Sequence, residues 1–268
     1  MTQELKNIIY NTVTEANRKM TPGEVERTVS LATGTDRGVV RLAIRDLVSM
    51  GELTYTYFYG ATYLEKSLDR PIRISKRIVI KPPHKAYQAQ PGDVVINIAS
   101  GAAFGDGAHP TTCLVLRTLD SVLGSRPLER TALLTGLDIG TGTGILAIAL
   151  AKLGVQAVVG IDIDPCAISE AIHNTSVNGL GKQVRITNAP LEECGSSFSL
   201  VVANLAFQTL SRLSAALSAR VEGNGMLILS GFKEPAANAL GKTYTEHGLR
   251  LIREEIERGW VCLVLRKG

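Results

Sequence analysis

The stretch that most constrains the fold of this chain runs from Leu137 to Leu146 and contains the pattern Asp-Ile-Gly-Thr-Gly-Thr-Gly. The apolar residues at 132–137 predict a buried strand, and those at 145–153 predict an apolar helix. The three glycines therefore lie on a strand-to-helix turn, where a backbone without Cβ atoms allows a ligand to approach closely. The start of the helix adds N–H groups and the positive end of the helix dipole.

The spacing of these glycines, Gly140, Gly142 and Gly144, fits the dinucleotide pattern G-x-G-x-x-G poorly, and no phosphate-loop Gly-Lys-Ser/Thr follows. The carboxylate of Asp138 would repel a pyrophosphate. It suits a ligand with a cationic centre, such as the sulfonium and α-amino groups of S-adenosylmethionine. The alternative is an ordinary glycine-rich turn with solvated carboxylates.

A second strand, predicted at 155–161, leads into Asp162. An acidic residue at the end of the second strand is placed to bind ribose hydroxyls. We therefore expect Asp162 to bind the ribose and Ile163 to lie against the adenine. The position of Asp162 therefore favours a binding site for a nucleoside-containing ligand over an ordinary glycine-rich turn with solvated carboxylates.

Six stretches occur in the order found in one known family: Phe104–Thr112, Leu137–Leu146, Gly160–Pro165, Val202–Ala206, Leu229–Gly231 and Gly259–Trp260. On these stretches, residues from about 70 to 268 resemble the ribosomal protein L11 methyltransferase (PrmA) family. The resemblance implies a Rossmann-like, seven-stranded α/β methyltransferase domain of class I. It also implies S-adenosylmethionine as cofactor and amino groups of a ribosomal protein as methyl acceptors. The first third of the chain does not match.

The resemblance also implies roles for single residues. The loop at 104–112 closes over the cofactor in the family, and Thr112 matches a position that contacts it. His109 is a candidate acid, base or lid residue, and the alternative is a packing or hydrogen-bonding residue. The family often has Thr where this chain has Asp106.

Strands and helices alternate through the matched region, which predicts a parallel sheet with helices on both faces and a closing antiparallel hairpin at 249–266. Ligands of such sheets lie beyond the carboxyl ends of the strands, where Asp138, Asp162, Asn204 and Ser230 all fall. The side-chain carbonyl of Asn204 can accept an N–H of an amine beside the cofactor. Phe207 either lines the acceptor slot or belongs to the core.

The apolar spacing and turn residues of the segment 1–66 predict three helices and a β-hairpin, an arrangement that resembles a winged helix-turn-helix domain. Arg37, Arg41 and Arg45 recur every four residues on the third helix, as in a recognition helix that contacts phosphates. Residues 1–65 nevertheless have a net charge of −1. Because non-specific DNA binding requires positive charge, we favour a domain that binds protein or dimerises.

The net charge of +4 comes from residues 66–90, which hold seven Lys or Arg and one acidic residue, while the residues on either side of this segment have a net charge of −1 each. We expect a basic, strand-rich linker at 67–98 between an N-terminal domain at 1–66 and a methyltransferase domain at 99–268. This linker faces nucleic acid or an acidic protein, or it is simply solvated; both interpretations stay open.

Several classes of protein are disfavoured. The sequence has no run of eighteen apolar residues and no N-terminal signal-peptide pattern. Its four cysteines and four histidines lack disulfide or metal-ligand spacing. We expect a cytoplasmic protein N-methyltransferase that uses S-adenosylmethionine and no metal. The alternatives are a methyltransferase of nucleic-acid base amino groups and a regulator that binds S-adenosylmethionine without catalysis.

Overall fold

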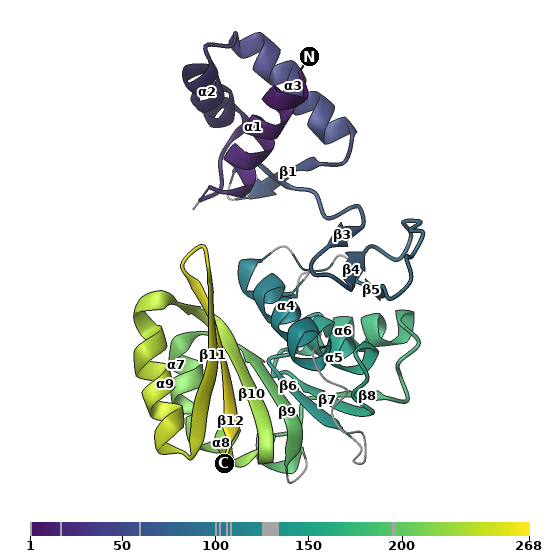
Figure 1. Cartoon of the computed structure of the whole chain (residues 1–268). Coiled ribbons are helices and arrows are strands. Elements are labelled where there is room, and N and C mark those ends of the chain that lie inside the picture. The colour runs from purple at the N-terminus through teal and green to yellow at the C-terminus, as the bar shows by residue number, and fades with distance from the viewer. Residues whose placement is uncertain are drawn as a thin grey trace. The chain divides into compact units, whose positions relative to one another are not determined.

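The computed structural model describes residues 2–16, 18–58, 60–99, 101, 103–105, 107, 109–124, 134–194 and 197–268. Asp106 and residues 132–133, which the sequence analysis singled out, lie outside these ranges. The chain forms two compact units, Met1–Arg70 and Pro71–Gly268 (Figure 1). None of the helices in the described ranges combines the length and apolarity needed to cross a membrane.

The first unit contains three helices and a two-stranded antiparallel sheet: α1 (Gln3–Thr14), α2 (Pro22–Thr33), α3 (Arg37–Ser49), β1 (Leu53–Phe58) and β2 (Ala61–Lys66). Thr21 and Glu24 form the capping box that begins α2, and Asp36 accepts the N–H groups of Gly38 and Val39 at the start of α3. These polar starts and a small apolar core produce the helices and hairpin that the sequence predicts. The winged-helix assignment remains a prediction.

Two of the arginines of α3, Arg37 and Arg41, lie close to an acidic residue of α2. Glu26 of α2 is 5% exposed and accepts two hydrogen bonds of 2.8 Å from Arg41, while Arg37 lies 3.9 Å away. The hydrogen bond from Arg41 holds the pKa of the Glu26 carboxyl below its usual value, against the opposing effect of burial. This carboxylate therefore offsets part of the positive charge that α3 would offer to a phosphate backbone.

The second unit is built on a seven-stranded sheet with the strand order β11-β12-β10-β9-β6-β7-β8. Its strands are β6 (Thr135–Ile139), β7 (Ala157–Ile161), β8 (Val184–Thr187), β9 (Phe198–Asn204), β10 (Val221–Lys233), β11 (Leu249–Glu257) and β12 (Trp260–Lys267). The pairs from β10 to β8 are parallel, and β12 is antiparallel to both of its neighbours. This order confirms the predicted Rossmann-like α/β class and the closing hairpin.

Helices cover both faces of this sheet (Figure 1). One face packs against α4 (Pro110–Gly124) and α5 (Ile145–Lys152), and α6 (Pro165–Val177) follows β7. The other face packs against α7 (Phe207–Arg212), α8 (Ser214–Ala219) and α9 (Ala237–Glu246). We refer below to the α4 face and the α9 face of the sheet.

A small three-stranded sheet precedes α4 in the same unit: β3 (Ile72–Arg73), β4 (Ile78–Lys81) and β5 (Val94–Asn97). Its isoleucines join the core on the α4 face. Three arginines of the basic segment are paired with acidic residues: Arg70 with Glu52, Arg73 with Asp93, and Arg77 with Asp120. The segment therefore contributes to the fold, and these ion pairs compensate the charge of three of its seven basic residues.

Candidate functional site

The register of the sheet brings two predicted site residues together. Asp138 of β6 pairs with Val202 of β9, so Asn204, two residues further, points to the same face as Asp138. Val202 packs in the core beneath α4 and α5, so this is the α4 face. Ser230 of β10 pairs directly with Asn204. The carboxyl ends of the central strands thus gather polar groups on one face of the sheet.

Asp138 is fully buried. Its Oδ2 accepts hydrogen bonds from Thr141 Oγ1 at 2.6 Å and from the N–H of Ala147 at 3.1 Å, whereas its Oδ1 has no partner. Burial raises the pKa of the carboxyl to about 7, although these two hydrogen bonds favour the charged form. A buried carboxylate with an open oxygen favours a ligand that brings a positive charge or a hydrogen-bond donor.

The N–H groups of the glycine loop are used within the protein. Five consecutive residues donate: Gly140 and Thr141 to the Ile161 carbonyl, Gly142 to Asp162 Oδ2, Thr143 to the Phe104 carbonyl, and Gly144 to the Thr141 carbonyl. A loop that binds a pyrophosphate would keep such groups free for the anion. The geometry therefore supports the prediction that this loop is not a phosphate cradle.

Asp162 and Ile163 follow β7 at the same edge of the sheet. The Asp162 carboxylate accepts the N–H groups of Gly142 at 2.9 Å and Asp164 at 3.1 Å, and each oxygen retains a further lone pair. Ile163 is 97% exposed, which is unusual for an isoleucine in a well-packed domain. A carboxylate beside an exposed apolar side chain matches a ribose with an attached flat base.

Two more candidates have buried polar atoms without partners. Thr112, in the first turn of α4, is 1% exposed, and its Oγ1 has no hydrogen bond. The Oδ1 of Asn204 is likewise buried and unpartnered. Unsatisfied buried polar atoms are rare in proteins, and three of the eight such side-chain atoms among the described residues belong to Thr112, Asp138 and Asn204, which were selected from the sequence. Together these three atoms mark a site that a polar ligand would complete.

Leu205 is held between two glycines that the structure requires. A Cβ on Gly140 would lie 2.4 Å from Leu205 Cδ2, and a Cβ on Gly231 would lie 2.4 Å from the Leu205 carbonyl oxygen. Both glycines also have positive φ, 70° and 98°. The predicted stretch around Gly231 thus has a physical explanation, because it fixes the backbone directly after Asn204.

An aromatic cluster, which the sequence analysis did not identify, surrounds His109. The His109 ring lies 5.1 Å from Phe104 and 4.9 Å from Trp260 between centroids, and Lys233 Nζ lies 3.8 Å from the Trp260 ring. The N–H of Thr111, at 3.3 Å, points to His109 Nδ1. Thr111 Oγ1 lies closer still, 2.7 Å from the same ring nitrogen, so Nδ1 is engaged by the first turn of α4. The arrangement supports a packing role for His109 over that of a base.

Phe207 opens α7 and packs, partly buried, against the core on the α9 face. This placement supports the core interpretation over the acceptor-slot interpretation. The sequence could not choose between them, because either role puts an aromatic residue a few positions after a strand.

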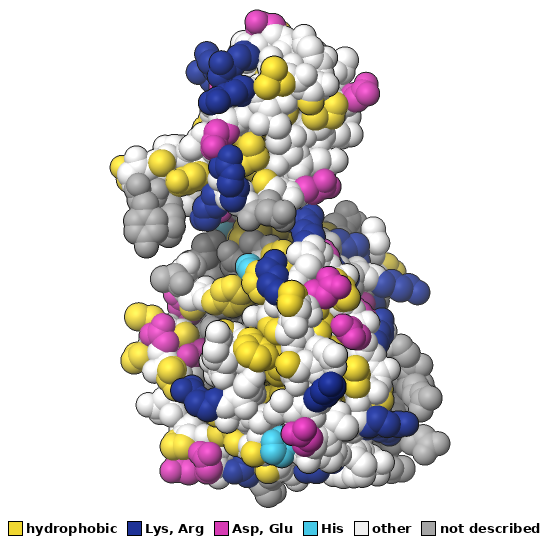
Figure 2. All heavy atoms as spheres, turned by 90° about the vertical axis from the view of Figure 1, so that its left-hand side faces the viewer, with side chains coloured by type: hydrophobic (Ala, Val, Ile, Leu, Met, Phe, Trp, Pro, Cys, Tyr) yellow, Lys and Arg dark blue, Asp and Glu magenta, His cyan; other side chains and the backbone are white. Residues whose placement is uncertain are grey.

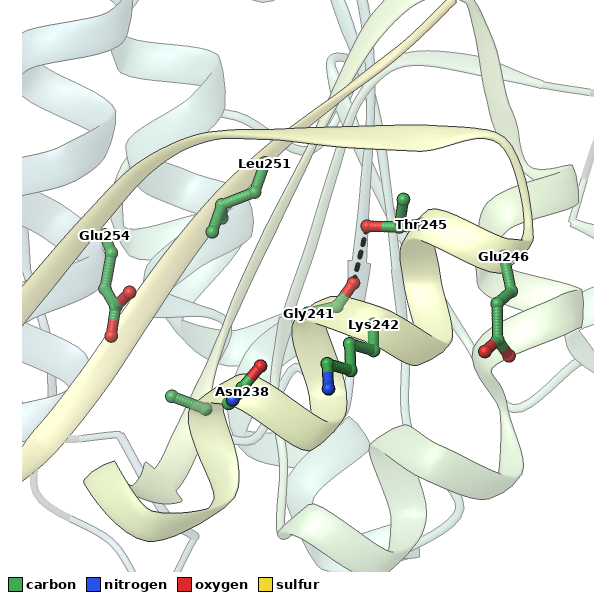
Figure 3. Close-up of a pocket in the computed structure, with 8 residues that line it drawn as sticks. Asn238, Gly241, Lys242, Thr245, Glu246, Leu251 and Glu254 are labelled. Atoms are coloured by element: carbon green, nitrogen blue, oxygen red, sulfur yellow. Dashed lines mark hydrogen bonds between the residues drawn. The ribbon is translucent and has the colours of Figure 1, made fainter.

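A groove of about 520 Å³ lies elsewhere, between α9 and β11 (Figure 3). Leu251 and Glu254 line it from β11, and the other lining residues belong to α9, where Thr245 Oγ1 donates to the Gly241 carbonyl. Glu254 pairs with Leu263, which points to the α9 face, so the groove is opposite the site of Asp138. Figure 2 shows hydrophobic and charged side chains mixed over this side of the second unit.

Comparisons with known proteins agree with this geometry. The family model described as "Ribosomal protein L11 methyltransferase (PrmA)" matches residues 63–268. Proteins named ribosomal protein L11 methyltransferase from Geotalea daltonii and Geobacter sulfurreducens are 37% and 40% identical over 204 and 196 residues. These matches cover 75% and 73% of this chain but only 65% and 62% of the relatives. The chain therefore spans less than two thirds of their length.

A crystal structure titled ribosomal protein L11 methylase, from Lactobacillus delbrueckii subsp. bulgaricus, is also similar. It superposes with a TM-score of 0.64 at 28% sequence identity. The superposition covers 74% of this chain and all of that chain. This likeness supports the α/β fold of the matched region.

Replacing Asp138 with Asn tests how much the buried, ionised carboxyl lowers the free energy of unfolding. Because the folded-state pKa of about 7 exceeds the unfolded value of 3.8, the native chain binds the extra proton between these values. This stabilisation is full below about pH 4 and is lost as the pH rises through about 7. Asp138→Asn cannot ionise, so at pH 8 it should be more stable than the parent, by on the order of 2–4 kcal/mol.

The measurement is thermal unfolding of the ligand-free chain at pH 5 and pH 8, with the exposed Glu192→Gln as control. The parent and the control should lose stability between the two pH values, and Asp138→Asn should lose less. Equal losses in all three proteins would contradict this account of Asp138.

Proposed function

The chain belongs to the ribosomal protein L11 methyltransferase (PrmA) family, and on that basis we propose that it transfers a methyl group from S-adenosylmethionine to an amino group of a protein. A ribosomal protein is the first candidate target. The observation that carries the proposal is the pair of buried, unpartnered oxygens of Asp138 and Asn204 on one face of the sheet. One suits the cationic end of the cofactor, and the other suits the acceptor amine. We further propose that the enzyme acts in the cytoplasm.

The residues present fit the cofactor. Asp138 Oδ1 would accept a hydrogen bond from its α-amino group, and Asp162 would bind the ribose hydroxyls. Ile163 would cover the adenine, and Thr112 Oγ1 is a further polar contact from α4. When bound, S-adenosylmethionine supplies a methyl group activated by a sulfonium. The protein's task is then mainly to position and desolvate the reactants.

Asn204 is placed to orient the acceptor. Its free Oδ1 accepts an N–H of a neutral amine and so directs the nitrogen lone pair away from the Asn204 side chain. Leu205, wedged between Gly140 and Gly231, holds the Asn204 backbone in place. Phe104, 54% exposed, and Trp260 supply apolar surface that excludes water near the amine. His109 orders these rings and does not take the proton.

A nucleic-acid methyltransferase, the alternative from the sequence, is not favoured. The named relatives are protein methyltransferases. Glu26 engages Arg41, and the three arginines of the basic segment are paired with acidic residues, which reduces the charge available to phosphates. The reaction on total cell extract decides between the two substrates.

The first unit is our candidate for substrate selection. The family model begins at residue 63 and so leaves out nearly all of the first unit, which ends at Arg70. The cofactor candidates all lie in the second unit. We propose that residues 1–70 recognise the macromolecular substrate and take no part in cofactor binding.

Asp162→Ala tests the ribose contact. Loss of hydrogen bonds to a charged group should weaken S-adenosylmethionine binding by about 1.5–3 kcal/mol. Calorimetry measures the affinity, and far-ultraviolet circular dichroism checks that the strand end stays folded. Since Asp162 also holds the Gly142 N–H, Asp162→Asn is the matched variant and should lose less. Unchanged affinity in Asp162→Ala would remove the residue from the cofactor site.

Asn204→Ala tests the acceptor contact. Misplacing a reacting group by about 1 Å costs on the order of a hundredfold in rate, so turnover should fall steeply while cofactor affinity falls less. Turnover is followed as transfer of labelled methyl to cell extract, divided by protease and nuclease. Label found only in nuclease-sensitive material would favour the alternative. Parent turnover by Asn204→Ala on a protein would place the acceptor elsewhere.

A truncated chain that begins at Pro71 tests the division of labour. It should bind S-adenosylmethionine with the affinity of the full chain and lose methylation of the macromolecular target. Calorimetry and the labelled-methyl reaction measure the two properties side by side. Full methylation by the truncated chain would show that the first unit does not select the substrate.

A further inference from the structure

Three polar side chains of α6 and its C-cap bind the backbone that leads into the site. The N–H of Asn97 donates to Asn178 Oδ1 at 2.9 Å, and Asn178 Nδ2 donates back to the Asn97 carbonyl at 2.7 Å. The N–H of Ala99 donates to Asn174 Oδ1 at 3.0 Å. Further along, the N–H of Ala103 donates to both oxygens of Glu170, at 3.1 and 3.2 Å.

The spacing of the first two of these contacts follows from simple geometry. Residues 170, 174 and 178 are four apart, which is a rise of about 6 Å along a helix. Alternate residues of an extended chain are about 6.6 Å apart. The two periods nearly match, so Asn178 and Asn174 can bind the alternate residues Asn97 and Ala99 as a neighbouring strand would. Glu170, one helical step further, binds Ala103, which lies four residues after Ala99 and so does not follow this period. We call this set of hydrogen bonds the α6 ladder.

Asn174 connects the α6 ladder to the glycine loop. It is 1% exposed, and besides accepting from Ala99 it donates through Nδ2 to the Thr143 carbonyl at 2.9 Å. Thr143 in turn binds the incoming segment twice. Its N–H donates to the Phe104 carbonyl at 2.9 Å, and its Oγ1 donates to the Gly105 carbonyl at 2.7 Å.

The other end of the α6 ladder lies next to the aromatic cluster. Glu170 binds Ala103, and the next residue, Phe104, places its ring 5.1 Å from His109, which contacts Trp260. Gly101 lets the carboxylate approach, since a Cβ there would lie 2.2 Å from Glu170 Oε2. The position of Phe104 therefore depends on a carboxylate of α6 that is not among the residues predicted to bind the cofactor or the acceptor.

We propose that Glu170 and Asn174 are positioning residues for methyl transfer. This inference rests on the proposed function. Through the α6 ladder they fix the position of Phe104 relative to Thr143. Phe104 belongs to the aromatic cluster that we place beside the acceptor, and Thr143 belongs to the glycine loop that we place beside the cofactor. A purely structural role would stabilise the fold without coupling these two places.

Glu170→Ala and Glu170→Gln test the proposal in the full chain, with the exposed Ser169→Ala of the same helix as control. Glu170→Gln keeps an oxygen that can accept the Ala103 N–H, and Glu170→Ala does not. Hydrogen exchange followed by NMR should show faster exchange of the Ala103 amide in Glu170→Ala only. In Asn174→Ala, the Ala99 amide should lose protection instead.

Trp260 is the single tryptophan of the chain, so its fluorescence reports on the aromatic cluster. Acrylamide should quench it more strongly in Glu170→Ala than in the parent, and Glu170→Gln should restore the parent value. We expect kcat to fall on the order of tenfold or more in Glu170→Ala, with little change in the dissociation constant of S-adenosylmethionine. Glu170→Gln should recover most of this loss.

The outcomes separate the inference from the proposed function. If Glu170→Ala keeps the Ala103 amide protected and Trp260 shielded, the positioning role is wrong, whatever the activity. Equal losses of kcat in Glu170→Ala and Glu170→Gln would also overturn it. If the parent chain neither binds S-adenosylmethionine nor transfers methyl, the proposed function fails, and amide exchange and quenching alone decide whether the α6 ladder positions Phe104.

Discussion

The structure of the site depends on how the glycine loop satisfies its own N–H groups. Five successive donors find acceptors within the second unit, among them the Asp162 carboxylate and the Phe104 carbonyl. A loop in this state does not attract an anion, although its helix dipole points the right way. The loop instead has a backbone fixed by its own hydrogen bonds, next to an Asp138 Oδ1 that has no hydrogen-bond partner. The hydrogen bonds of the site therefore favour a ligand with a cationic centre over a phosphate, and this argument does not depend on the comparison with related proteins.

Asp138 shows how such a site differs from the surrounding core. Its neighbours on the strand, Leu137 and Ile139, are apolar and buried, yet this position holds a carboxyl whose pKa burial raises to about 7. An uncharged residue would make the ligand-free fold more stable, and a ligand that supplies a donor would remove the penalty. Thr112 and Asn204 have the same character, because each buries an oxygen without a partner. Sites that bind ligands tightly often retain polar groups that destabilise the empty protein.

The two units divide the chemistry in a consistent way. The second unit contains every candidate for cofactor binding, and its family match is specific. The first unit has its own core and its own capped helices, which is why it forms a compact unit distinct from the second. Its recognition-like helix places Arg41 on the buried Glu26, so charge that appears free in the sequence is partly neutralised in the fold. This arrangement suits a protein partner better than a phosphate backbone.

The sequence alone determined the α/β class, the order of strands and helices, and the residues at the carboxyl ends of the strands, because periodicity and glycine position are local properties. The charge of Asp138 and the position of Asp162 already indicated S-adenosylmethionine. The family resemblance, now confirmed, supported that cofactor and added the protein substrate and the roles expected of Thr112 and His109. The sequence did not determine which groups are satisfied. The carboxylate of Glu26, the His109–Trp260 contact and the α6 ladder join residues 15 to 151 positions apart in the chain. Such pairings arise only when sheet register and helix packing bring distant segments together, and so the tertiary structure decided them.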